Sequence, residues 1–304
     1  MKVLVTGAYG FLGKYVIKEF ADRNAAAGEK PVYEVKTMGL NPHNDYRADL
    51  IKETPGVEES FGMVVHLCGT CRPENAGNVN VATTEHLIAM LEKSAPKQLV
   101  YISSLEVYGR TEGEELTEGT VKDPTSRVGK SKLMAEELLL KWADRSGAVL
   151  TILRCPPIVG TGMTGPLRQM VNSIYRAAYH HIEDETQRLS VVHAVDVARA
   201  AVDLAPIGGA YNMTDGVNPS RRELAEAFAW RLDGKRIYTL RARRARIAAR
   251  IFDYLPFAAF DSAKLAERYR TLTYSADKVI GALGWKPNSV VDYLRNHVYD
   301  ENSL

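Results

Sequence analysis

Three glycines spaced three residues apart near the N-terminus have the spacing needed to bind a phosphate group. Gly7, Gly10 and Gly13 follow an apolar run at residues 3–6 and precede a segment whose apolar residues recur with helical period. Glycine lets the backbone approach a ligand closely, and the free amides at a helix N-terminus attract an anion. A strand, a glycine loop and a helix in this order favour a dinucleotide-binding turn over a merely tight turn.

The end of the second expected strand, residues 33–38, does not indicate whether the cofactor is NAD or NADP. An acidic residue there would hold the ribose hydroxyls of NAD, and an arginine would bind the 2′-phosphate of NADP. The sequence continues Gly39-Leu40-Asn41 and has neither residue. We therefore expect NAD or NADP as the cofactor.

The pattern around the glycine loop predicts an α/β fold with a Rossmann-type, doubly wound parallel sheet. Short β-rich runs alternate with helical patterns, which is typical of βαβ units. The expected strands are residues 3–6, 33–38, 63–67, 99–103 and 149–154. A helix near residues 166–178 should follow, and then a strand at 189–192 and a helix at 195–204 that could rejoin the sheet.

The remaining chain predicts a smaller, mainly helical C-terminal lobe that binds the substrate. Its expected helices are residues 220–232, 241–254 and 276–283, joined by polar or proline-bearing loops. We accordingly divide the chain into two domains. Residues 1–155 with 186–206 form the NAD(P)-binding domain, and residues 156–185 with 207–304 form the substrate lobe.

Composition excludes several classes of protein. Of the 304 residues, 45% are hydrophobic and 25% are charged, which argues against a disordered chain. The 39 Lys+Arg nearly balance the 37 Asp+Glu, which argues against a nucleic-acid binder. No apolar run approaches the roughly 18 residues of a transmembrane helix. Three cysteines make no disulfide framework, so we expect a reducing, cytoplasmic location.

Beyond the glycine loop, further segments resemble the extended short-chain dehydrogenase/reductase family in order and spacing, within its nucleotide-sugar epimerase/dehydratase branch. The matching segments are Asp49-Leu50, His66-Leu67-Cys68-Gly69, Asn80 at the expected start of a helix, Ser103 to Gly109, Gly129 to Glu136, His193 to Ala198 and Leu283 to Pro287.

The resemblance implies a set of cofactor-binding residues and a catalytic set. For the cofactor these are Gly7, Tyr9, Gly10, Phe11, Leu12, Gly13, Asp49, Leu50, Leu67, Cys68, Gly69, Ser103, Lys132, Pro156 and Ile158. Lys132 would bind the nicotinamide ribose, and Ser104 would polarise the substrate oxygen. A strand-end serine satisfied by the backbone is the alternative interpretation of Ser104.

The resemblance fails at the residue that moves the proton. The family carries Tyr-x-x-x-Lys, but four residues before Lys132 this chain has Val128. Valine has no proton to give, and a positioned acid/base contributes about 10²–10⁴ in rate. No tyrosine lies between Tyr108 and Lys132 that could restore the motif.

Three explanations of Val128 stay open. The protein binds a dinucleotide without turnover, or a neighbouring group moves the proton, or Val128 does not belong to the natural sequence. Glu106 is the candidate neighbour, because dehydratases and decarboxylases of the family carry a glutamate base at that place. The acid that precedes this base in dehydratases is Leu105 here, and an exposed glutamate after a strand is also a common solvated residue.

Cysteine and histidine patterns do not predict a metal or redox site. Cys68 and Cys71 form a C-x-x-C, but they follow a strand at the expected cofactor loop and have no second pair. Three histidines, His180, His181 and His193, could act as ligands by residue type alone. We expect these histidines at the surface or in turns.

The residues from Lys235 to Arg250 include seven basic side chains and no acidic one. This segment could have one of three roles: a solvated helix face, contact with a substrate diphosphate, or contact with an anionic membrane. Membrane contact is the least expected of the three. The family usually dimerises through helices that begin here near Val79 and Ser126. The apolar residues Met134, Leu138 and Trp142 would permit a homodimer, but core packing would explain them equally.

The leading functional hypothesis is redox-assisted modification of a nucleotide sugar or a similar hydroxyl/carbonyl compound with atypical acid/base chemistry. Ser104, Lys132 and Glu106 would form the catalytic set. The alternatives are a catalytically impaired dinucleotide-binding regulatory or scaffold protein, and a ketone reductase of the steroid or flavonoid type.

Overall fold

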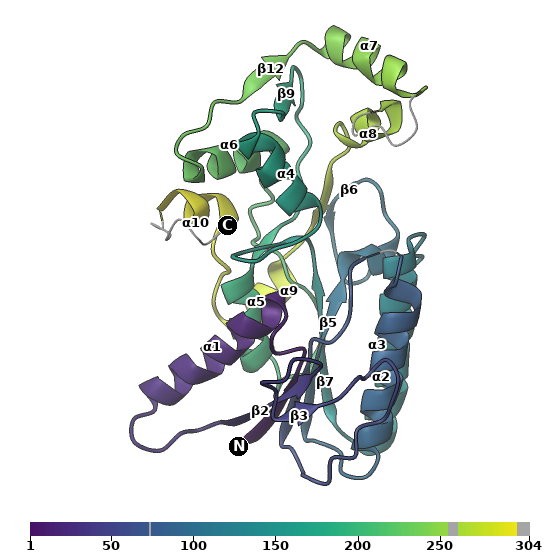
Figure 1. The fold of residues 1–304 in the computed structure, drawn as a ribbon, viewed down its shortest axis with the longest axis vertical. Helices are drawn as coiled ribbons and strands as arrows, with labels where there is room; N and C mark the ends of the chain where they lie inside the picture. The colour runs from purple at the N-terminus through teal and green to yellow at the C-terminus, as the bar shows by residue number, and fades with distance from the viewer. Residues whose placement is uncertain (73, 255–260, 297–304) are drawn as a thin grey trace.

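A seven-stranded parallel sheet organises one half of the molecule in the computed structural model, which describes residues 1–72, 74–254 and 261–296 (Figure 1). Its strands run in the order β11-β7-β5-β4-β1-β2-β3. Their bounds are β1 Lys2–Thr6, β2 Glu34–Gly39, β3 Tyr46–Arg47, β4 Met63–His66, β5 Gln98–Ser104, β7 Val149–Cys155 and β11 Gly209–Asn212.

Helices cover both faces of this sheet. Helices α1 (Phe11–Ala26) and α5 (Ala194–Asp203) lie on one face, and α2 (Ala76–Leu91) and α3 (Arg127–Ser146) lie on the other (Figure 1). Successive side chains of a strand point to opposite faces, so each central strand is apolar on both sides. The sheet is therefore doubly wound, as the sequence predicted.

The five predicted strands are present within one or two residues, but the sheet has two more. Strand β3 has two residues, and β11 begins Gly-Ala, so neither carries a β-type pattern in the sequence. Strand β11 pairs with β7 and lies beyond residue 206, inside the range assigned to the lobe. The predicted strand at 189–192 does not rejoin the sheet; instead β10 (Val192–His193) pairs with the short β8 (Ile158–Val159).

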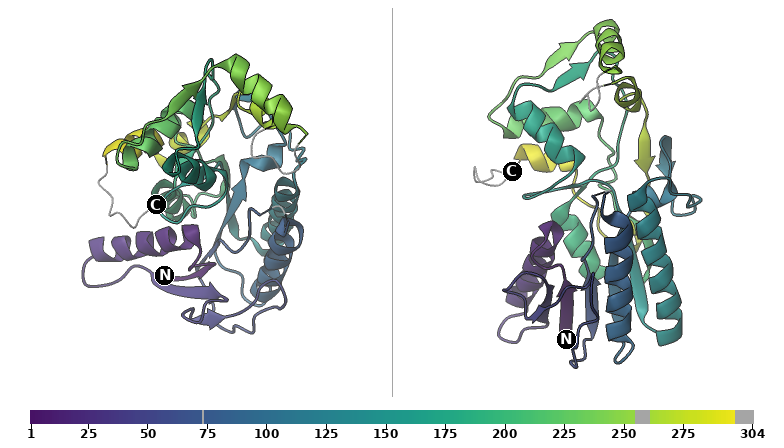
Figure 2. Two further views of the ribbon diagram at one scale, coloured as in Figure 1. Left: turned by 45° about the horizontal axis from the view of Figure 1, so that its top comes forward. Right: turned by 45° about the vertical axis from the view of Figure 1, so that its right-hand side comes forward.

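The other half of the molecule contains strands as well as helices (Figures 1 and 2). Its helices are α4 Pro166–Tyr175, α6 Arg221–Arg231, α7 Ala242–Phe252, α8 Ser262–Glu267 and α10 Val290–Asn296. Two parallel strand pairs accompany them, β6 (Gly113–Leu116) with β13 (Leu272–Tyr274) and β9 (His180–Ile182) with β12 (Tyr238–Leu240). Helix α9 (Asp277–Leu283) instead joins the core beside α1 and α5 through Val279. The division into two domains stays a prediction.

A buried ion pair connects helix α3 to the centre of the sheet. The Arg154 guanidinium on β7 contacts the Glu136 carboxylate on α3 through Nη2–Oε2 at 2.7 Å and Nε–Oε1 at 3.0 Å. Ser103 on β5 donates to the same carboxylate. Arg154 also donates to the Tyr108 hydroxyl, which donates to Asn212 on β11. One network of side chains thus joins α3, three strands and the turn after β5.

Removing one partner of this ion pair should destabilise the fold strongly. Glu136 is 0% exposed, so Glu136→Ala leaves the Arg154 charge buried without its partner. We expect the free energy of unfolding, measured by urea denaturation, to fall by about 3–5 kcal/mol. Glu137→Ala, at the exposed neighbouring position of α3, serves as the control and should change it by about 0.5 kcal/mol or less. Equal losses in the two variants would contradict a structural role for the pair.

Candidate active site

The glycine loop packs tightly between strand β1 and helix α1. Gly7 has φ +69°, and its amide donates to the Met38 carbonyl of β2 at 2.9 Å. A Cβ atom on Gly13 would lie 2.4 Å from the Gly7 oxygen and 2.3 Å from the Ala8 oxygen. A side chain at residue 13 would therefore push the loop away from the helix.

Helix α1 begins with the features that bind an anion. Its N-cap, Gly10, is extended and provides no side-chain cap, and the first turn has no acidic residue. The first amides of a helix carry partial positive charge and lack intrahelical partners. Leu12 is buried, and the Phe11 ring packs edge-on against Tyr15, so these residues offer their backbone amides. The loop and the helix fit the pyrophosphate of a dinucleotide.

The loop after strand β4 is held against the glycine loop. The Thr6 hydroxyl accepts from the amides of Leu67 and Cys68, each at 3.2 Å. It also lies 2.8 Å from Nδ1 of His66. Burial lowers the pKa of His66 to about 3, so this histidine stays neutral and acts as a hydrogen-bonding group. These contacts fix the predicted cofactor residues Leu67 and Cys68 beside Gly7.

Asn80 clamps this second loop to helix α3. Its amide oxygen accepts from the Thr70 amide at 2.7 Å, and its nitrogen donates to the Ser131 hydroxyl at 2.9 Å. The expectation that Asn80 opens the helix was wrong, because α2 begins at Ala76 and buries Asn80 one turn later. The clamp was missed, since no sequence spacing links Asn80 to Ser131.

Lys132 lies beneath this loop. Its side chain is on the buried face of α3, only 7% exposed, and Nζ donates to the Ile102 carbonyl at 2.9 Å. A Cβ atom on Gly69 would lie 3.4 Å from Nζ, so the amine sits directly against the loop. Lys132 is thus placed at the carboxyl ends of the strands, where ligands bind in open α/β sheets.

Val128 lies one helical turn before Lys132 on the same face of α3. Its side chain is 1% exposed, and the helix begins at Arg127 with Ser126 as its N-cap. Residues four apart on a helix share a face, so Val128 occupies the place next to Lys132 from which a side chain reaches the same site. That place holds no group that can exchange a proton.

Ser104 and Glu106 stand at the end of strand β5, next to the start of α3. The Ser104 hydroxyl accepts from the Glu106 amide at 3.2 Å, and the exposed Glu106 carboxylate accepts from the Ser126 hydroxyl. Both contacts lie in η1 (Leu105–Tyr108) or beside it. A Cβ atom on Gly129 would lie 2.4 Å from the Glu106 carbonyl oxygen, so the first turn of α3 packs directly on η1. The structure brings the predicted catalytic residues Ser104, Glu106 and Lys132 to the same end of the sheet.

Other predicted cofactor residues have partners within the protein. The Tyr9 hydroxyl donates to the His43 carbonyl at 2.9 Å, and the Asp49 carboxylate accepts from the Ile51 amide at 3.1 Å. Leu50 is in the core, and the Ser103 hydroxyl is engaged by Glu136. Their cofactor contacts stay predictions. The same holds for Pro156, which follows β7, and for Ile158 of β8.

The cysteine and histidine candidates can be located in the described part of the chain. Within the described residues, no three His, Cys, Asp or Glu side chains are grouped to hold a metal ion. Burial raises the pKa of the Cys68 thiol to about 11, which keeps it protonated. The prediction of surface or turn histidines was wrong for two of them. His181 is a 3% exposed residue of β9, which pairs with β12, and His193 is 1% exposed, caps helix α5 and packs against the Tyr15 ring.

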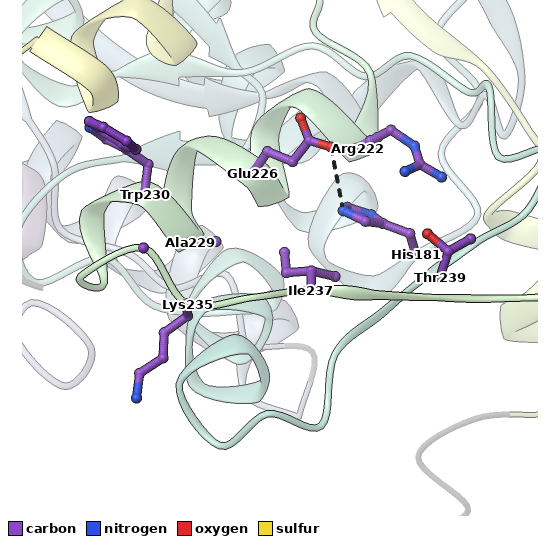
Figure 3. Close-up of a pocket in the computed structure, with 9 residues that line it drawn as sticks. His181, Arg222, Glu226, Ala229, Trp230, Lys235, Ile237 and Thr239 are labelled. Atoms are coloured by element: carbon purple, nitrogen blue, oxygen red, sulfur yellow. Dashed lines mark ion pairs between the residues drawn. The ribbon is translucent and has the colours of Figure 1, made fainter.

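A separate open hollow lies in the other half of the molecule, between α6 and the β9/β12 pair (Figure 3). It has a volume of about 280 Å³, and Arg222, Glu226 and Trp230 line it together with His181. The His181 Nε2 atom lies 3.7 Å from the Glu226 carboxylate. None of the predicted cofactor or catalytic residues lines this hollow, so it is a different surface from the site around Lys132.

The apolar residues expected to support a dimer divide between core and surface. Trp142 is 1% exposed in the core, whereas Met134 is 52% exposed. The homodimer stays a prediction. Among the described residues, no helix combines the length and the apolar character needed to cross a bilayer.

A methyl group at Gly13 should weaken dinucleotide binding without unfolding the protein. Gly13→Ala places an atom against two loop carbonyls, so the loop must shift from the helix N-terminus. We expect the Kd for NAD or NADP, measured by calorimetry, to rise at least about tenfold, which is 1.4 kcal/mol. The control is Gly77→Ala on α2, where a Cβ meets nothing within 4 Å. Unchanged affinity in Gly13→Ala would rule out this loop as the pyrophosphate site.

Comparisons with known proteins agree with this geometry. The profile of the family described as "NAD dependent epimerase/dehydratase family" matches residues 3–212. UDP-glucose 4-epimerase of Bacillus subtilis (strain 168) is 25% identical over an alignment of 284 positions, and the match covers 78% of this chain and 84% of that protein.

Two further proteins are similar. The N-acetyl-alpha-D-glucosaminyl-diphospho-ditrans,octacis-undecaprenol 4-epimerase of Escherichia coli O157:H7 is 30% identical over 57% of this chain and 53% of its own length. The solved structure of UDP-glucuronic acid 4-epimerase from Bacillus cereus in complex with NAD superimposes with a TM-score of 0.73 at 18% identity, covering 97% of this chain and 96% of that one. The chain belongs to the NAD dependent epimerase/dehydratase family, with NAD or NADP as its cofactor.

Proposed function

We propose that this protein uses NAD(P) to modify a nucleotide sugar, or a similar hydroxyl or carbonyl compound, with acid/base chemistry that differs from the family's. The observation that carries the proposal is the arrangement around Lys132. Lys132, Ser104 and Glu106 lie at one end of the sheet, and Val128 lies one helical turn before Lys132, where the resemblance leads us to expect a tyrosine. The similarity to the Bacillus subtilis UDP-glucose 4-epimerase supports the choice of substrate class.

In this proposal each side chain has a separate task. Bound NAD(P) supplies the hydride acceptor and donor. The buried amine of Lys132 binds the cofactor's ribose hydroxyls. The Ser104 hydroxyl already accepts from the Glu106 amide, so its own hydrogen can be donated to the substrate oxygen.

Glu106 is the group proposed to move the proton. Its carboxylate is exposed, and the Ser126 hydroxyl holds its Oε2 atom at the start of α3. When a substrate hydroxyl is oxidised, its proton passes to the carboxylate, directly or through one ordered water. The same proton returns to the substrate oxygen when the carbonyl is reduced.

A second candidate function is dinucleotide binding without turnover, in a regulatory or scaffold protein. The observation that favours it is the 1% exposure of Val128, which fills the tyrosine position with an apolar side chain. A ketone reductase of the steroid or flavonoid type is a further alternative that would need the same replacement for the tyrosine.

Replacing the Glu106 carboxylate distinguishes these functions. With NAD(P) and a panel of UDP-sugars, we expect Glu106→Gln to lower kcat by about 10²-fold or more, since the amide cannot accept the proton. The Kd for NAD(P) should stay within about twofold. Glu112→Gln, an exposed acid beyond η1, is the matched control and should keep full activity. Full activity in Glu106→Gln would exclude the glutamate as the base.

A second test replaces Val128 with tyrosine, which gives the chain the phenol that the family carries at this place. A non-catalytic binder should turn over no substrate in its natural form. In that case Val128→Tyr should produce turnover, and Val128→Phe should not. The phenylalanine variant matches the added ring without the hydroxyl, and the NAD(P) affinity of all three proteins shows whether the buried position accepts the ring.

A further inference from the structure

Helix α7 buries one narrow face and leaves the opposite face uncovered. Its buried residues are Ala242, Ala245 and Ala249, which pack in a small cluster with Ile182 and Leu265. At 100° per residue, positions 247 and 251 lie nearly opposite these alanines. Ile247 is 52% exposed and Ile251 is 61% exposed. The outward face therefore has large apolar side chains at its centre.

Exposed arginines border this apolar stripe on both sides. Arg243 and Arg250 lie on one side of Ile247 and Ile251, and Arg244 lies on the other. All three are exposed, and the sequence from Lys235 to Phe252 contains no acidic residue. The positive charge of this face is therefore not neutralised by acidic side chains of its own segment.

The helix lies at the end of the molecule's long axis. Figure 1 and the right-hand view of Figure 2 both show α7 at the tip farthest from the central sheet. The site around Lys132 lies at the carboxyl ends of the central strands. The arginines of α7 are therefore poorly placed to contact a substrate diphosphate there, and α7 lies at the outer end of the described part of the molecule.

We propose that the outward face of α7 binds the surface of an anionic phospholipid membrane. A helix with an apolar stripe flanked by cationic side chains lies in the plane of the lipid headgroups, with the stripe inserted and the cations near the phosphates. A solvated face has no need of two exposed isoleucines, and a nucleic-acid surface would not place them at its centre. Membrane contact, the least expected role of this segment from sequence, is the role that the geometry favours.

Vesicle cosedimentation of the full chain tests the proposal. We expect binding to phosphatidylglycerol/phosphatidylcholine vesicles at about 50 mM salt, little binding to phosphatidylcholine alone, and a marked loss at about 500 mM salt because exposed charges are screened. No binding to the anionic vesicles at low salt would overturn the proposal.

Two sets of substitutions assign the binding to this face. Arg243→Gln/Arg244→Gln/Arg250→Gln should weaken binding by roughly a hundredfold, since each basic residue near an anionic surface contributes about fivefold. Ile247→Ser/Ile251→Ser should weaken it by at least about tenfold. Binding retained in either variant would overturn the proposed face.

Matched controls use exposed residues elsewhere. Lys18→Gln/Lys52→Gln/Arg145→Gln removes three charges whose side chains are 70%, 80% and 63% exposed. Val32→Ser/Ile207→Ser removes apolar side chains from residues that are 47% and 54% exposed. Both controls should bind like the natural protein. All variants should retain its thermal unfolding midpoint and its affinity for NAD(P), so that a loss of binding reports on α7 alone.

Discussion

The buried pair of Glu136 and Arg154 is the interaction on which the site depends. It joins helix α3 to strand β7, and through Tyr108 and Asn212 it reaches the edge strand β11. Buried charges are tolerated only when they are paired and hydrogen-bonded, so α3 has little freedom to slide or rotate on the sheet. Because α3 also carries Val128 and Lys132, the pair fixes the positions of these two residues relative to the carboxyl ends of the strands.

Most of the fold and the position of the glycine loop could be predicted from local sequence. Glycine spacing, strand alternation and helical period are local signals, and they placed Gly7, Gly10 and Gly13 correctly before α1. Contacts between distant residues could not be predicted in this way. The Asn80–Ser131 clamp joins residues 51 positions apart, and β11 pairs with β7 although its own residues show little strand preference. His181 and His193 were misplaced for the same reason, since their burial depends on tertiary neighbours.

In the proposed site, cofactor binding and proton transfer depend on side chains from different elements. The groups proposed to hold the cofactor extend from the uncapped start of α1 to the buried Lys132 amine. The Val128 side chain has no proton to exchange, and the exposed carboxylate of Glu106 lies on a different element, η1. The proposed chemistry therefore rests on whether Glu106 can reach the substrate that Ser104 orients.

A crystal structure with NAD bound tests the central claim most directly. The account predicts the pyrophosphate at the start of α1, Lys132 within hydrogen-bond distance of the ribose, and Val128 facing the nicotinamide with Glu106 as the nearest carboxylate. A nicotinamide bound away from Val128 and Lys132, or a tyrosine from another element in contact with it, would contradict the account.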